Sequence, residues 1–306
     1  MSFVKRYNTF SDDLKLMFGC KVQRISIDAG FTCPNRDGSL DTAGCIFCGG
    51  HGSGSHGIIR NLSVAEQIED GKEVMRRKYR ASKFIAYFQS YSNTYAPVEQ
   101  LRFLYTDALS VPDVVGLIVA TRPDCLPDDV LDYLQELSRK TYFWLELGMQ
   151  SIHDRSLEMI NRRHKHDCTI AAVQRAKLRK LRVCVHIILG MPGETREEML
   201  AMAGELNRLK IEGVKLHLLH VMKGTKLAET YGRGEVKVMG RDDYVGLVCD
   251  LLELLDPRIL IHRLTGDGGH DNLVAPLWSL KKFEVLNLID AEMERRGTKQ
   301  GSRFSP

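Results

Sequence analysis

One stretch, CPNRDGSLDTAGCIFC, organises the sequence and runs from Cys33 to Cys48. Its three cysteines follow the spacing C-x11-C-x2-C, and a glycine-rich segment, GGHGSGSHG, comes directly after it. Three thiols cannot all pair into disulfides, because the number is odd, but three thiolates in one loop are a good start to a metal site. The proline, asparagine, aspartate and glycine residues between them predict a polar, turn-rich loop rather than buried core.

The cysteine loop alone leaves three interpretations open. A cluster of four irons and four sulfides held by three cysteines keeps one iron open for chemistry, whereas four cysteines close such a cluster. In the second interpretation His51, three residues after Cys48, completes a closed Cys3His zinc site. In the third, the thiols bind no metal. The rest of the chain has to separate these interpretations.

Length and composition describe an ordinary globular chain. The 306 residues are 43% hydrophobic and 27% charged, and barrels of alternating strands and helices commonly use such a length as one domain. A net charge of +4 is too small to indicate a polyanionic partner. No apolar run reaches membrane-spanning length, and the first residues do not resemble a secretory signal. Eight cysteines without such a signal predict a cytoplasmic location and no membrane partner.

Apolar strand-like runs alternate with helical patterns along most of the chain. The expected strands are 22–28, 83–89, 114–121, 141–148, 182–190 and 213–221, with a seventh near 259–267. The expected helices are 63–79, 98–109, 128–140, 154–161, 167–180, 194–209, 242–255 and 277–296. Continuous apolar strands separated by helices indicate a parallel sheet buried on both faces. At least six such units predict a complete or partial (β/α) barrel, with a doubly wound open sheet as the alternative.

Polar residues recur where the expected strands end. Gln89, Arg122, Gln150 and Gly190 follow four different strands, and catalytic groups of barrels collect in these loops. A zinc ribbon folds as a small independent module and does not need six following strand–helix units. The barrel pattern therefore favours the iron–sulfur interpretation of the cysteine loop.

Three motifs together carry a family resemblance. They are the cysteine loop, ELGMQS from Glu146 to Ser151, and HIILGMPGET from His186 to Thr195. With them the chain resembles radical S-adenosylmethionine (SAM) enzymes of the YhcC/YtqA-type bacterial branch, which shares its widely spaced first cysteine with the catalytic subunit of elongator. The resemblance covers about residues 20–265. It implies a partial (β/α)6-type barrel in a single domain, 1–306, with a short N-terminal extension and a helical C-terminal extension over about 270–306.

The resemblance also implies a set of site residues. Cys33, Cys45 and Cys48 correspond to the ligands of a 4Fe-4S cluster. Contacts with SAM fall to Phe47, Gln89, Glu146, Gln150, Arg162, His186 and Gly190. In that set Gln150 approaches the ribose, and Arg162 suits the carboxylate because a guanidinium binds it bidentately. Gln89-Ser90-Tyr91 stands where relatives have the glycine–glycine–glutamate turn for the SAM amino group, and His186 stands where they often place an acidic ribose contact.

The implied activity follows from the open iron, which chelates the amino and carboxylate groups of SAM. One electron then cleaves a carbon–sulfur bond and yields a 5′-deoxyadenosyl radical that abstracts hydrogen. The resemblance further implies a flavodoxin or ferredoxin as electron donor and tRNA, at its wobble uridine, as substrate. Two alternatives remain at this point: a zinc-binding interaction protein built on Cys33, Cys45, Cys48 and His51, and a radical SAM fold that acts as partner or regulator of another enzyme.

Several residues near these motifs have weaker assignments. We interpret His51 and His56 as solvated loop residues, and Cys125 and Cys168 as the thiols placed nearest the radical chemistry. His217 and His220 alternate with leucines, and one interpretation of this pattern turns them towards the barrel interior as substrate contacts. Aromatic and leucine residues before position 20, including Phe10 and Leu14, suggest a lid.

Overall fold

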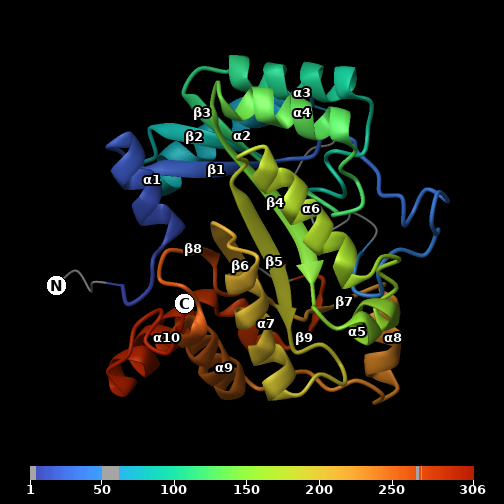
Figure 1. The fold of residues 1–306 in the computed structure, drawn as a ribbon, viewed down its shortest axis with the longest axis vertical. Coiled ribbons are helices and arrows are strands. Elements are labelled where there is room, and N and C mark those ends of the chain that lie inside the picture. Colours follow the sequence, from blue (N-terminus) through green and yellow to red (C-terminus); the bar gives the residue numbers. More distant parts are fainter. Residues whose placement is uncertain (1–4, 50–61, 267–268, 270) are drawn as a thin grey trace.

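The computed structural model of the chain describes residues 5–49, 62–266, 269 and 271–306. At its centre lie seven strands, all parallel, in the order β1-β2-β3-β4-β5-β6-β8. They are β1 (Val22–Ile27), β2 (Lys83–Phe88), β3 (Val114–Thr121), β4 (Tyr142–Gln150), β5 (Val183–Leu189), β6 (Gly213–Leu218) and β8 (Leu260–Arg263). The sheet curls into an open half-barrel (Figure 1), which confirms the predicted partial barrel.

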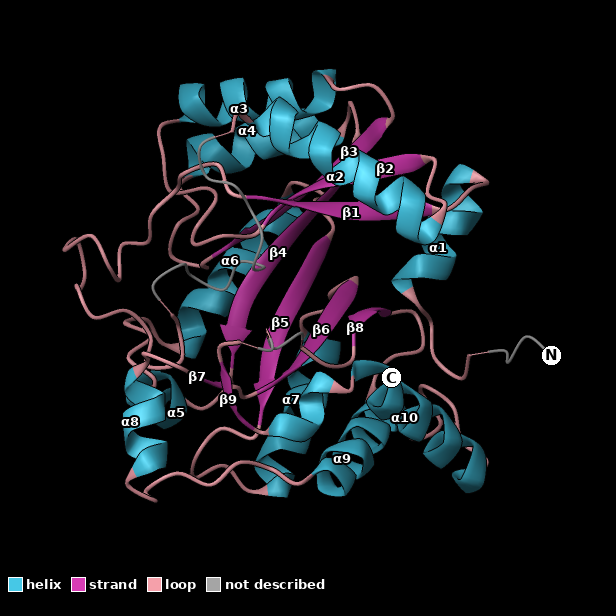
Figure 2. Ribbon diagram, turned by 180° about the vertical axis from the view of Figure 1, so that it is seen from behind, coloured by secondary structure: helices cyan, strands magenta, loops and turns pink. Residues whose placement is uncertain are grey.

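Helices follow the strands and pack around the outside of the curl, as Figure 2 shows from behind. They are α2 (Val64–Tyr79), α3 (Val98–Ser110), α4 (Asp128–Ser138), α5 (Asp154–Met159), α6 (His166–Leu178), α7 (Arg196–Arg208), α9 (Arg241–Leu254) and α10 (Lys282–Arg296). Every second residue of the strands, such as Phe88, Leu145 and Leu216, enters the core between sheet and helices. Burying one such side chain contributes about 1.5–3 kcal/mol.

Four short elements lie outside the expected pattern. A two-stranded antiparallel sheet joins β7 (Val221–Met222) to β9 (Leu273–Ala275), and α8 (Lys226–Gly232) follows β7. The helix expected over 277–296 is interrupted, because a 3-10 turn, η1 (Leu277–Leu280), ends before α10 begins. Among the described residues, no helix is long and apolar enough to cross a membrane.

The N-terminal helix α1 (Phe10–Phe18) closes the end of the half-barrel where the strands begin. Phe10 and Leu14 pack against the inner face of the sheet, in a cluster with Ile85, Ile118 and Trp144. The backbone of Ile261 donates to Asn8 O at 2.8 Å, so the segment before α1 also extends the edge of β8. The expectation that these residues form a lid is therefore wrong: they plug the end opposite the cysteine loop.

Candidate functional site

Backbone hydrogen bonds give the cysteine loop, between β1 and α2, its shape. Cys33 O accepts hydrogen bonds from the amides of Arg36 at 2.8 Å and Asp37 at 3.1 Å, and Cys48 N donates to Cys45 O at 2.9 Å. Between the last two cysteines, Ile46 N donates to Ile160 O at 3.1 Å and Ile46 O accepts from Leu227 N at 2.9 Å. The loop is therefore held on one side by the segment after α5 and on the other by α8.

Polar side chains of the loop fasten it to the same segment. Asn161 Nδ2 donates to Gly44 O at 2.8 Å and to Asp41 Oδ2 at 3.1 Å. In return, Asn35 Nδ2 donates to Asn161 O at 2.6 Å. Gly44 has φ +74°, and a Cβ there would lie 2.8 Å from Arg36 Nε, so glycine suits both the backbone and the space. These contacts explain why a loop so rich in turn residues adopts one shape.

Amide and guanidinium donors surround the thiols. Arg162 Nη1 lies 3.8 Å from Cys45 Sγ, and Asn35 Nδ2 lies 3.7 Å from the same sulfur. Burial raises the pKa of the Cys48 thiol, the nearby Arg36 guanidinium opposes that rise, and the charges of Cys45 and Cys33 add to it. Metals bind the thiolate form of cysteine, and neighbouring cations favour that form.

The three cysteines of the loop act on one another electrostatically, since Cys45 and Cys33 both raise the pKa of the Cys48 thiol. A cluster of four irons would bind each of the three thiolates at a different iron and leave the fourth iron open. His51 and His56 lie outside the described residues.

The end of β4 meets the cysteine loop through Arg162. Arg162 Nη2 donates to Gly148 O at 2.7 Å, and a Cβ at Gly148 would lie 2.7 Å from Gln150 Nε2 and 2.9 Å from Arg162 Nη2. Gln150 and Arg162 therefore lie together over Gly148, beside Cys45. Arg162 is 6% exposed, and its Nε has no hydrogen-bond partner among the described residues, which leaves a buried donor for an acidic group.

Arg122, which follows β3, contacts Arg162 and helps to hold it beside Gln150 and Cys45. Its guanidinium pairs with Asp124 through two hydrogen bonds of 2.8 and 2.7 Å, and its Nη2 also donates to Arg162 O at 2.9 Å. Burial lowers the pKa of Arg122, but Asp124 and the nearby Cys33 and Cys45 outweigh burial and raise this pKa above its ordinary value. This arginine stays charged beside the thiols.

Three other expected residues lie around the same end of the barrel. Gly190 has φ +83° and begins the turn after β5, and Phe47 packs in the cluster that contains Met191 of that turn. Gln89, after β2, donates through Nε2 to Ser26 Oγ at 3.0 Å. The loops after β1, β2, β4 and β5 thus bring the expected residues to the strand ends, where barrels place their sites.

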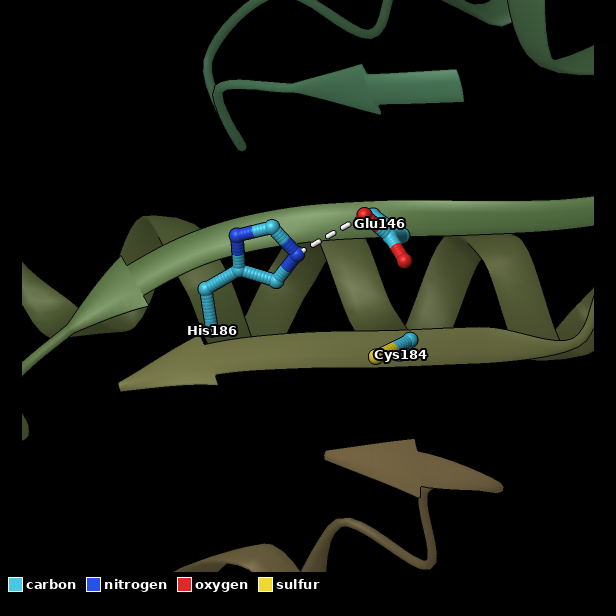
Figure 3. Close-up of side chains that lie close together, drawn as sticks. All are labelled: Glu146, Cys184 and His186. Atoms are coloured by element: carbon cyan, nitrogen blue, oxygen red, sulfur yellow. Dashed lines mark hydrogen bonds and ion pairs between the residues drawn. The ribbon is translucent and has the colours of Figure 1, made fainter. Parts of the chain in front are cut away.

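Glu146 lies deeper, on the inner face of β4, and is the centre of a buried network. Lys215 Nζ and His186 Nε2 both contact its Oε2, at 2.5 and 2.9 Å, and Lys215 also donates to Tyr87 OH at 2.8 Å. Figure 3 shows Glu146 facing His186 from the neighbouring strand, with Cys184 close by. The Glu146 side chain is fully buried, whereas that of His186 is 16% exposed.

Burial and charge set the protonation of this network. Burial alone would raise the pKa of Glu146, but Lys215 and His186 hold it well below its ordinary value. Burial lowers the pKa of Lys215 to about 8 against the opposing pull of Glu146, and burial also lowers the pKa of His186. At neutral pH the network therefore holds a carboxylate, an ammonium and a neutral imidazole.

The structure divides the expected site residues into two depths. Gln150 and Arg162 lie beside the cysteine loop, while Glu146 has no exposed surface and contacts His186 on the neighbouring strand. His217 lies next to His186, with ring centroids 5.4 Å apart. Cys125 and Cys168 line a pocket of about 750 Å³ beside Asp124 and Arg175.

Sequence reasoning missed Lys215. Its signal was present, because Lys215 alternates with Val214 and Leu216, which face the helices, and so must face the interior. A lysine at an interior strand position calls for a buried partner. Which partner it finds depends on the curl of the sheet.

Two models of known families match this chain. The radical SAM superfamily matches residues 33–206, and the Radical SAM C-terminal domain matches residues 211–295. The chain therefore belongs to the radical SAM superfamily, and within it to the family of YtqA and YhcC.

The relatives behind this assignment span nearly the whole chain. YtqA of Bacillus subtilis is 46% identical over 98% of this chain and 93% of its own length. YhcC of Escherichia coli is 37% identical over 99% of this chain and 96% of its own length. A tRNA uridine(34) acetyltransferase of Methanocaldococcus jannaschii is 28% identical over 60% of this chain and 34% of its own length.

A solved structure shares the fold. The archaeal Elp3 of Methanocaldococcus infernus, lacking its first 46 residues, superposes with a TM-score of 0.72 at 20% identity. The match covers 91% of this chain and 64% of that structure, so the chain spans just under two thirds of its length.

Proposed function

We propose that this protein is a radical SAM enzyme in which Cys33, Cys45 and Cys48 hold a 4Fe-4S cluster with one open iron. The observation that carries the proposal is the cysteine loop itself, fixed in shape and joined by Arg162 to the end of β4. When bound there, cluster and SAM supply a 5′-deoxyadenosyl radical after one-electron reduction, and the radical abstracts hydrogen from the substrate.

The residues around the loop then have separate tasks. Arg162, with its unpartnered Nε, binds the SAM carboxylate, and Gln150 beside it faces the ribose. Phe47 and the Gly190 turn border the adenine, and Gln89 lies on the side of the amino group. Glu146 acts through His186 because its own carboxylate is fully enclosed. The buried guanidinium of Arg122 balances the negative charge of the thiolates.

Formation of 5′-deoxyadenosine tests the activity. Protein purified without oxygen and reduced with dithionite should form it from SAM, and Cys45→Ala should abolish this because an iron loses its ligand. Cys20→Ser is the matched control, since Cys20 packs beside the α1 plug at the far end of the barrel. Product in the Cys45→Ala variant equal to wild type would reject the proposal.

For the substrate we propose tRNA, at the wobble uridine. The support is the partial match to a tRNA uridine(34) acetyltransferase, together with the shared fold of the archaeal Elp3. Modified nucleosides in tRNA from cells without this protein should differ from wild type at the wobble position only. Re-expression of wild type should restore the pattern and Cys45→Ala should not. An unchanged nucleoside profile would reject tRNA.

We further propose a flavodoxin or ferredoxin as electron donor in a reducing cytoplasm. All eight cysteines are unpaired thiols, as is usual in a reducing compartment. Reduced flavodoxin or ferredoxin should therefore replace dithionite in the 5′-deoxyadenosine assay. Cleavage of SAM with dithionite but with neither protein would reject these two donors.

A further inference from the structure

The buried network around Glu146 joins polar side chains from several strands. Lys215 crosses from β6 to reach a carboxylate on β4, and that carboxylate also accepts from His186 on β5. Three parallel strands are thus joined on the inner face of the barrel by an ion pair and a neutral imidazole, and the ion pair has almost no exposed surface. Buried charges of this kind are costly unless fully paired, so the arrangement needs an explanation.

One explanation is a metal site, because ligand atoms of Glu146, Cys184 and His186 lie within 4.8 Å of one another. The position of Lys215 argues against it. Its ammonium already contacts Glu146 Oε2 at 2.5 Å, and a divalent cation on the same oxygen would lie beside a buried positive charge. Burial also raises the pKa of Cys184 well above its ordinary value, which keeps this thiol protonated.

The second explanation follows from which atoms can donate. A carboxylate only accepts hydrogen bonds, so the contact of 2.9 Å requires His186 Nε2 to carry the proton. Because the imidazole is neutral, its other nitrogen, Nδ1, then holds a lone pair. In Figure 3, Nδ1 lies on the side of the ring away from Glu146.

We propose that Lys215 and Glu146 are positioning residues that fix His186 in the Nε2–H tautomer, so that Nδ1 accepts a hydrogen bond from a hydroxyl group of bound SAM. Lys215 keeps Glu146 ionised, and Glu146 orients the ring. This inference rests on the proposed function and goes beyond it, because it assigns a task to Lys215 and a direction to the hydrogen bond. An aspartate or glutamate at position 186 would accept without any partner, whereas a histidine accepts only when its tautomer is fixed.

The surroundings of the pair match this role. Tyr87 from β2 receives the second hydrogen bond of Lys215, and the Lys215 ammonium lies 4.2 Å from the centroid of the Tyr87 ring. Other charged or titratable groups face the network from the remaining strands: Arg24 on β1, Cys184 on β5, His217 on β6, and His262 and Arg263 on β8. Glu146 is the carboxylate that contacts His186 Nε2, through Oε2, and His262 Nδ1 lies 3.4 Å from its other oxygen, Oε1.

Nitrogen-15 NMR of the oxidised holoprotein, labelled on its histidine rings, tests the tautomer directly. The signal of His186 is assigned by its loss in His186→Gln. At pH 7 we expect a protonated Nε2 and an unprotonated Nδ1, and SAM should shift the Nδ1 signal. A protonated Nδ1, an imidazolium, or an Nδ1 signal that ignores saturating SAM would overturn the proposal.

Two variants test the positioning residues. In Glu146→Gln, Lys215 should hold the amide oxygen and leave the amide N–H to face His186, which reverses the tautomer. SAM should then bind about tenfold more weakly, as the loss of one hydrogen bond predicts. Lys215→Arg keeps the charge and should retain the Nε2–H tautomer, and Cys184→Ala is the neighbouring control that should change neither readout.

Iron content separates this inference from the proposed function. Glu146→Gln should keep the iron and sulfide of wild type because it does not touch the cysteine loop. If the wild-type protein binds no iron, the proposed function is rejected. If Glu146→Gln binds iron but keeps the wild-type tautomer and SAM affinity, only the positioning role is rejected.

Discussion

At the scale of single residues, the inner face of the barrel is notable for charge placed where water is excluded. Glu146 and Lys215 have side-chain exposures of 0% and 1%, and Lys215 Nζ pairs with Glu146 Oε2 at 2.5 Å. Replacing one member of such a pair leaves an uncompensated charge, while replacing both removes the problem. The stability of the protein should therefore depend on the two residues together rather than on either alone.

Lys215→Met should lower the free energy of unfolding by about 3–5 kcal/mol, because Glu146 loses its buried counter-charge. Lys215→Met combined with Glu146→Gln should cost less than the sum of the single changes. Urea unfolding followed by circular dichroism measures all four proteins. The control is Lys140→Met, whose exposed ion pair with Glu136 should matter by less than about 1 kcal/mol. Additive effects of the two buried changes would contradict the pairing.

His262 predicts how stability depends on pH. Its ring stacks on Phe10 with centroids 3.9 Å apart, and burial lowers its pKa to about 3 against an unfolded value of 6.5. As pH falls from 6.5 towards 3 the unfolded chain binds a proton that the native protein does not, so stability falls by up to about 1.4 kcal/mol per pH unit. His262→Gln should lose this contribution, and its stability deficit against wild type should shrink on acidification. A constant deficit would show that His262 titrates normally.

At the scale of elements, the sequence predicts the strands and helices well and the side-chain contacts between distant strands poorly. The strand ends were placed within four residues, because apolar runs bounded by turns mark them, and β3 matches at both ends. The helix predicted over 277–296 was wrong at Lys281, where the 3-10 turn ends and α10 begins, and nothing in the hydrophobic period marks that break. The cysteine loop could be recognised from the sequence because its three cysteines lie close together along the chain. The contact of Lys215 with Glu146 was not, since 69 residues separate them.

A methyl group added at Gly148, near the end of β4, tests where SAM binds. Gly148→Ala places a Cβ against Gln150 Nε2 and Arg162 Nη2, which are the ends of side chains and can move. We expect a folded protein that keeps its iron but binds SAM at least tenfold more weakly, measured by equilibrium dialysis without oxygen. Gly204→Ala is the control: it lies in α7 with nothing within 4 Å of its Cβ, so it should leave SAM binding unchanged and stabilise the helix by up to about 1 kcal/mol. Wild-type affinity in Gly148→Ala would place SAM elsewhere.

At the scale of the whole molecule, a segment near the N-terminus, around Arg6 and Asn8, meets a segment near the C-terminus, around Gln300, beside β8. Gln300 is 4% exposed, and its Nε2 donates to Asp256 O and Ile259 O, both at 2.9 Å. Its Oε1 accepts from Asn8 N at 2.8 Å, and its backbone amide donates to Arg6 O. One side chain thus joins the N-terminal segment, the approach to β8 and the C-terminal segment at the open edge of the half-barrel.

Gln300→Ala should destabilise the fold by about 1–3 kcal/mol, because two buried carbonyls and one amide lose their partner. Thermal unfolding measures the loss, and Lys299→Ala, an exposed neighbour, should change stability by less than about 0.5 kcal/mol. Equal melting temperatures for both variants would show that the contacts of Gln300 do not hold this edge together.

Electron paramagnetic resonance of the reduced protein, recorded with and without SAM, tests the central claim most directly. An iron that no residue of the chain ligates should take SAM as its ligand, so the signal of a reduced 4Fe-4S cluster should change its g-values when SAM is added. Cys33→Ser, Cys45→Ser and Cys48→Ser should each lose that signal, while Cys20→Ser should keep it. Stoichiometric zinc without iron, or a cluster signal identical with and without SAM, would contradict the account.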